Sequence, residues 1–196
     1  VALAVFMGLR SGSRGGPLAL EPPDVRHDLL SPVDRGVALR GPAWRQLRFL
    51  VAVGAAVGAA TGQLVVRRLP GNAFEWIVFG ALYGVTLVGL GYGSALLASG
   101  LKVKHWMASL IGALLVVWSA GDLIGKLPLS PFTVVGHIAV WPLEPDWLAL
   151  AGVVLAVVLV VLGMRWVSGI SLEAAERRTA LVGQMRFAVT LQDLRT

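Results

Sequence analysis

Four stretches of this chain run for sixteen residues or more without a charged side chain: 49–66, 76–101, 106–121 and 147–164. A helix needs about 20 apolar residues to cross the roughly 30 Å hydrocarbon core of a bilayer. A transmembrane strand would need only about ten residues, alternating apolar with polar, and residues 153–160 are apolar throughout. The sequence therefore predicts an all-α, polytopic bundle with full spans over about 49–66, 74–101, 106–124 and 147–165.

The composition agrees with a chain whose main partner is the lipid bilayer. Hydrophobic residues make up 56% and charged residues 14%, with a mean hydropathy of +0.75, whereas soluble domains carry about 25% charge. The absence of cysteine excludes disulfides and thiolate-ligated metals. The net charge of +6 comes from basic residues that flank apolar runs, so nucleic-acid binding is not expected.

Both ends of the chain read as parts of longer segments. Residues 1–9 are apolar but too short to span, which predicts the end of a truncated transmembrane helix. Residues 193–196 stop inside a helical pattern without a Gly or Pro signal. We therefore expect a partial chain with four full spans and the tail of a fifth.

The distribution of Lys and Arg predicts the orientation, because cytoplasmic loops retain positive charge during insertion. Loop 10–48, connection 102–105 and tail 167–196, counted together with Arg165 just before the tail, hold fourteen basic residues, whereas the alternate loops hold three. We expect these three segments to be cytoplasmic in a multi-pass protein of the cell membrane, and the proline-rich stretch 126–146 to be external.

The cytoplasmic segments predict short amphipathic helices. Asp24 can cap a first helix, which Ser31 and Pro32 would end. A second helix is expected over 34–48, offering Val37, Leu39, Trp44 and Leu47 to the membrane interface or to a partner. A third, cytoplasmic helix is expected within 167–196.

Recognisable catalytic patterns are missing. The sequence contains no phosphate-binding loop, no H-E-x-x-H and no G-x-S-x-G. Its three histidines, at 27, 105 and 137, fall on loops of both membrane sides, so we expect no metal, no cofactor and no enzyme. Glu75 and Asp122 are the carboxylates nearest the membrane; each could serve ion coupling or simply reach the headgroups from a helix end.

Glycines repeat every four residues on two of the predicted spans. Gly54, Gly58 and Gly62 line one helix face, and Gly80 and Gly84 line a face of the next helix. Small residues at this spacing allow two helix backbones to approach closely. Tight helix packing is the expected role, and a substrate path along these faces is the alternative.

Two segments carry a family resemblance. The sequence DVRHDLLSPVDR at 24–35 resembles a cytoplasmic segment of certain bacterial ABC exporter permeases, and residues 181–196 resemble actinobacterial members of that group. The resemblance implies a permease subunit without its own ATPase, driven by a separate cytoplasmic ATPase that docks on a coupling segment. The coupling residues it implies are Asp24, Val25, Leu29, Leu30, Ser31, Pro32, Asp34 and Arg35, with Leu29 and Leu30 inserted in the ATPase and Asp34 and Arg35 at the rim.

The chain departs from that family in length, since such permeases usually have six or more spanning helices. A homo- or heterodimer is one way to complete the bundle. The alternative function is a non-catalytic membrane scaffold or assembly protein whose cytoplasmic helices recruit partners. A lipid-modifying membrane enzyme would need polar residues clustered at one leaflet, and the sequence has only scattered ones.

Overall fold

The computed structural model describes residues 1–18, 35–127 and 130–170, and this part of the chain is helical without a strand. The fold class predicted from the apolar runs is confirmed. The elements, in chain order, are α1 (Ala2–Ser13), α3 (Arg35–Val65), α4 (Ala73–Gly100), α5 (His105–Leu123), α6 (Pro131–Gly136), the 3-10 turns η1 (His137–Val140) and η2 (Trp147–Ala149), α7 (Leu150–Arg165) and the 3-10 turn η3 (Val167–Gly169).

Within the described ranges, four helical stretches are long and apolar enough to cross a membrane: Gly36–Val65, Ala73–Gly100, His105–Leu123 and Trp147–Arg165. At 1.5 Å per residue the 31-residue α3 and the 28-residue α4 extend about 46 and 42 Å. Both exceed the roughly 30 Å hydrocarbon core, so each must tilt or extend beyond it. The chain is a multi-pass membrane protein.

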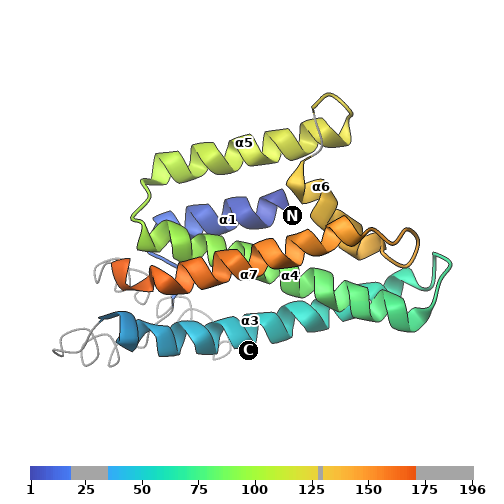
Figure 1. Cartoon of the computed structure of the whole chain (residues 1–196), viewed down its shortest axis with the longest axis horizontal. Helices are drawn as coiled ribbons and strands as arrows, with labels where there is room; N and C mark the ends of the chain where they lie inside the picture. Colours follow the sequence, from blue (N-terminus) through green and yellow to red (C-terminus); the bar gives the residue numbers. More distant parts are fainter. Residues whose placement is uncertain (19–34, 128–129, 171–196) are drawn as a thin grey trace, which may run out of the picture.

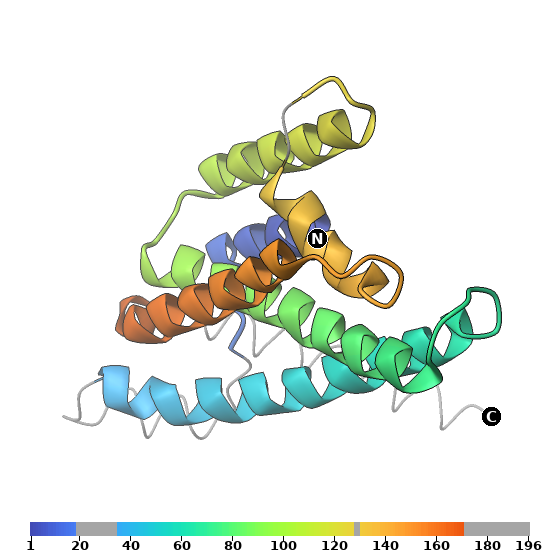
Figure 2. The same cartoon turned by 45° about the vertical axis from the view of Figure 1, so that its right-hand side comes forward.

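Helix α4 lies at the centre of the bundle, where α1, α3 and α7 all pack against it. Helix α5 packs against α1 on the side away from α3, and α6 connects α5 to α7 (Figures 1 and 2). Successive spans run in opposite directions. The C-terminal ends of α1, α4 and α7 therefore meet the N-terminal ends of α3 and α5 at one end of the molecule (Figure 1).

Two clusters of buried apolar side chains hold the bundle together. The first joins α3, α4 and the chain segments beyond α1 and α7, and consists of Leu18, Leu39, Ala43, Leu47, Tyr92, Leu96, Val167 and Ile170. The second fills the space between α1, α4, α6 and α7 and includes Phe132, Val135, Ile138 and Trp141. The Trp141 ring stacks on Phe79 of α4 at 4.9 Å between centroids, so the loop after α5 is packed onto the bundle.

Helix α3 differs from the sequence prediction, which placed a separate amphipathic helix over 34–48 before the span. One continuous helix begins at Arg35 and passes through Pro42 into the span. Leu39, Ala43 and Leu47 follow one another at four-residue spacing and are all buried. Because their apolar face continues along the bundle, packing outweighs the cost of the single proline.

Candidate functional site

Helices α3 and α4 approach each other closely at the glycines singled out in the sequence. A Cβ atom added to Gly58 would lie 2.8 Å from the carbonyl carbon of Gly80, and one added to Gly54 would lie 2.9 Å from the Gly84 carbonyl oxygen. Gly62 faces the backbone of Trp76 at a similarly short distance. These five residues and Trp76 form what we call the glycine seam, in which backbone packs directly on backbone.

Basic side chains of the described ranges gather at one end of the bundle, and only Arg67, Arg68 and Lys126 belong to the other. The end where α1, α4 and α7 terminate carries the basic side chains Arg10, Arg14, Arg40, Arg45, Arg48, Lys102, Lys104 and Arg165; we call it the basic end. The acidic side chains of the described ranges, Glu75, Asp122, Glu144 and Asp146, all belong to the opposite end. This pattern is what the loop charges predict for a cytoplasmic basic end, and the sidedness itself stays a prediction.

The first third of α3 is anchored to the bundle at the basic end. The Tyr92 hydroxyl, buried in α4, donates a hydrogen bond of 3.0 Å to the Ala43 carbonyl oxygen. Gln46 Nε2 donates one of 2.8 Å to the carbonyl oxygen of Pro17, which follows α1. Leu39 and Leu47 are buried, whereas Val37 and Trp44 are exposed. Of the four side chains expected to face the membrane interface or a partner, only these two are exposed.

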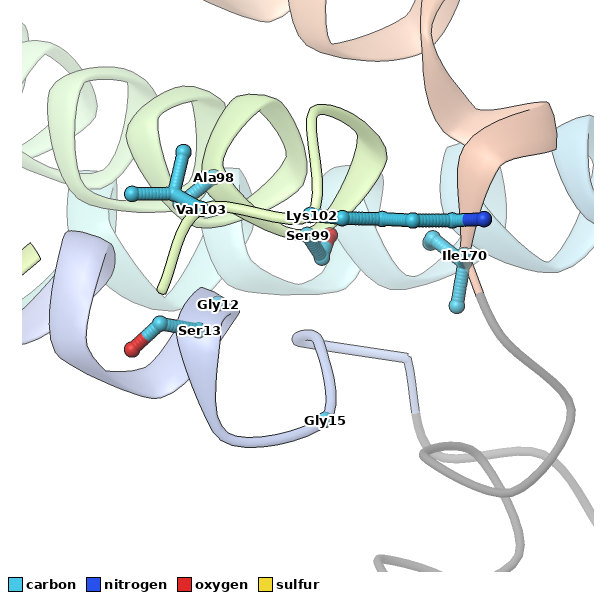
Figure 3. A pocket seen from close by; sticks show the side chains of 8 residues that line it. All are labelled: Gly12, Ser13, Gly15, Ala98, Ser99, Lys102, Val103 and Ile170. Atoms are coloured by element: carbon cyan, nitrogen blue, oxygen red, sulfur yellow. The ribbon is translucent and has the colours of Figure 1, made fainter. Parts of the chain in front are cut away.

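A pocket of about 280 Å³ lies at the basic end between the last turns of α1 and α4 and Ile170 (Figure 3). The Lys102 side chain extends across it in the direction of Ile170, and Lys102 adopts a left-handed φ of 53° where the chain leaves α4. Ser13 and Ser99 donate to carbonyl oxygens of their own helices, Arg10 and Leu96, at 2.9 Å. Both hydroxyl protons are thus directed to main-chain carbonyl oxygens, and the Ser13 oxygen also lies near His105.

His105 lies beside this pocket and connects α5 to α1. Its Nε2 is 3.1 Å from a guanidinium nitrogen of Arg14, and its Nδ1 is 3.4 Å from the Ser13 hydroxyl oxygen. Because Arg14 can only donate, Nε2 must be the accepting nitrogen. His105 was expected on a connecting loop; it is the first residue of α5.

The two carboxylates nearest the membrane occupy helix ends. Asp122, in the last turn of α5, accepts from the backbone N–H of Ser130 at 2.8 Å and from the Thr133 hydroxyl. It therefore connects the end of α5 to the start of α6. Glu75 is exposed in the first turn of α4, where the helix dipole favours a negative charge. Asp122 thus holds the end of its helix to the next segment, and Glu75 lies where its charge complements the dipole of α4.

A second polar pair secures the loop that precedes α7. His137 Nδ1 lies 3.0 Å from a carboxylate oxygen of Asp146, whose other oxygen accepts from the Leu148 N–H at 2.9 Å. The hydrogen bond from His137, followed by that from Leu148, lowers the pKa of Asp146 below its ordinary 3.8. Asp146 caps the turn that leads into α7.

Sequence reasoning missed the pocket beside Lys102 and the pairing of His105 with α1, because both depend on residues about 90 positions apart. Of the coupling residues, Asp24, Val25, Leu29, Leu30, Ser31, Pro32 and Asp34 lie outside the described residues, as does the helix expected after residue 170. Arg35 is placed as the first residue of α3.

Within the described residues, no group of three or more His, Cys, Asp or Glu side chains is arranged to hold a metal ion. Comparisons with protein-family models, with curated proteins and with solved structures found no match to this chain.

Proposed function

We propose that this chain is a membrane-spanning part of an ABC-type exporter permease, driven by a separate cytoplasmic ATPase that docks on residues 24–35. Its own part is conformational, and ATP hydrolysis belongs to the partner. One structural observation carries the proposal: α3 begins at Arg35, the last residue of the coupling segment, and continues without a break to Val65. A helix about 46 Å long thus starts where the ATPase would push.

The contact of α3 with α4 suits the transmission of such a movement. In the glycine seam backbone lies against backbone, so no large interlocking side chains have to change rotamer when α3 shifts. At the basic end the same helix is held by the Tyr92 and Gln46 hydrogen bonds. A displacement at Arg35 would therefore be passed along α3 to the seam and to α4.

The test is co-purification of ATPase activity with the affinity-tagged chain from membranes of its native host. Replacing both leucines of the coupling segment, Leu29→Asp with Leu30→Asp, should lower the retained activity by at least about tenfold, because charging two buried interface anchors costs more than 1.4 kcal/mol. Leu20→Asp, in the same loop but before the coupling segment, is the matched control and should retain the activity.

Equal ATPase activity with the double variant and with wild type would refute docking through Leu29 and Leu30. If no ATPase co-purifies even with wild type, the permease proposal fails. Other membrane proteins that co-purify in a manner sensitive to these leucines would then favour the scaffold or assembly function, because that function needs the same segment but no ATP hydrolysis.

A further inference from the structure

A groove opens between α3 and α7, with α4 as its floor. It has a volume of about 250 Å³ and is lined by Trp44, Leu47 and Val51 of α3, Val85, Thr86 and Gly89 of α4, and Val153, Ala156, Val157, Val160 and Val161 of α7. Thr86 donates its hydroxyl proton to the Leu82 carbonyl oxygen at 2.8 Å, so it offers no free donor to the groove. The lining is thus suited to a hydrocarbon ligand.

Basic side chains flank the end of this groove that is nearest the basic end. Arg48 directly precedes the uncharged run of α3, and its guanidinium carbon lies 5.5 Å from the centre of the Trp44 ring, one turn closer to the basic end. The arginine therefore extends away from the hydrocarbon, as long basic side chains do at a membrane interface. On α7, Arg165 continues the row formed by Val157 and Val161 at four-residue spacing, and it is exposed.

The size of the groove distinguishes between its potential occupants. From Trp44 to Val51 the α3 wall extends seven residues, or about 10 Å at 1.5 Å per residue. A partner helix is about 10–12 Å wide and would need a contact along most of a span. An acyl chain is thinner and can enter from the interface. Charge supplies the second argument, since the described acidic side chains belong to the opposite end of the bundle.

We propose that this groove binds one anionic phospholipid, with an acyl chain between α3 and α7 and its phosphate on Arg48 and Arg165. Guanidinium groups form charge-assisted, bidentate hydrogen bonds with phosphate oxygens. Trp44 lies at headgroup level, where indole rings are favoured. The site is separate from the glycine seam and does not depend on the permease proposal.

Native mass spectrometry tests this site. The purified full chain is released from detergent after addition of dioleoyl phosphatidylglycerol or dioleoyl phosphatidylcholine. Wild type should retain one phosphatidylglycerol in preference to phosphatidylcholine. The double variant R48Q/R165Q should bind phosphatidylglycerol about tenfold more weakly, because each basic residue near the headgroups raises the affinity for an anionic lipid several-fold. The single variant R40Q, which alters charge at the basic end but lies outside the groove walls, should bind as wild type does.

The apolar half of the site has its own pair of variants. Val157→Phe fills the groove and should reduce retention of both lipids, whereas Val154→Phe, on the same helix at an exposed position that does not line it, should not. Wild type gives a measurement that needs no variant: dihexanoyl phosphatidylglycerol, whose chains are short, should be retained far less than the dioleoyl form. The proposal is overturned if R48Q/R165Q and R40Q bind phosphatidylglycerol equally. It is also overturned if the two phenylalanine variants retain lipid equally, or if wild type retains the short-chain and dioleoyl lipids equally.

Discussion

Gly58 provides the most direct test of the close contact between α3 and α4. A Cβ atom at this position would lie 2.8 Å from the Gly80 carbonyl carbon, while ordinary van der Waals contact begins at 3.4 Å. The obstructing atoms are backbone, so no side chain can turn aside. The helices would have to separate locally by more than about 0.6 Å, the difference between those two distances, because the Gly80 carbonyl oxygen lies nearer still.

The expected cost of Gly58→Ala follows from two opposing effects. Overpacking in a close-packed interior costs about 1–3 kcal/mol, and the high end applies because separation also loosens the contacts of Gly54 and Gly62. Alanine regains about 1 kcal/mol over glycine as a helix former. The net expectation is a loss of about 2 kcal/mol in the free energy of unfolding.

The assay is equilibrium unfolding of the purified chain in mixed micelles with increasing dodecyl sulfate, followed by tryptophan fluorescence. Ala60→Val is the matched control, since it adds two carbon atoms to an exposed position of the same helix. It should shift the transition by less than about 0.5 kcal/mol, as surface substitutions usually do. The close backbone contact at Gly58 is refuted if Gly58→Ala unfolds at the same dodecyl sulfate fraction as wild type, or if Ala60→Val lowers the stability more than Gly58→Ala does.

Two further predictions concern the end opposite the basic end. Asp122→Ala should make trypsin cleave after the exposed Lys126 several-fold faster, because the carboxylate that joins α5 to Ser130 and Thr133 is lost. The control Glu75→Ala should leave the cleavage rate unchanged. Equal cleavage rates for the two variants would refute the anchoring role of Asp122. Asp146 contributes stability above its ordinary pKa of 3.8 that is lost as the pH falls through its lowered folded-state pKa. Asp146→Asn should therefore lose less stability than wild type between about pH 5 and pH 3 in the same unfolding assay, and identical losses would contradict the pairing with His137.

The spans could be predicted from sequence because a bilayer imposes a length on any helix that crosses it. Runs of sixteen to twenty-six uncharged residues leave few alternatives, and the structure has a long apolar helix at each. The ends of the helices are harder to predict: Trp76, the first residue of its uncharged run, is buried and donates its indole N–H to the Pro70 carbonyl oxygen at 3.2 Å. A tryptophan at the end of a run can cap a turn as well as face lipid.

The start of α3 could not be predicted from its apolar run. Arg40, Pro42 and Arg45 interrupt the apolar pattern, and local rules place a boundary there. The partners that bury Leu39 and Leu47 are Tyr92 and Val167, which lie about 50 and 120 residues further along the chain. Contacts between residues so far apart in the chain cannot be derived from a local sequence pattern. The Trp44 and Arg48 pair, by contrast, follows four-residue spacing, and that signal was available in the sequence.

Helix α3 is therefore the element that relates the proposals to one another. It begins at Arg35, the last residue of the segment proposed for coupling, its Trp44 and Arg48 border the lipid groove, and its glycines form the seam with α4. A lipid held against Arg48 and Arg165 would join α3 to α7 at the basic end, next to the place where an ATPase would act. If α3 moves during transport, lipid binding and movement must be linked, since a ligand that prefers one position of α3 shifts the equilibrium towards it. R48Q/R165Q should then alter the ATP-dependent activity of the assembled transporter, whereas R40Q should not.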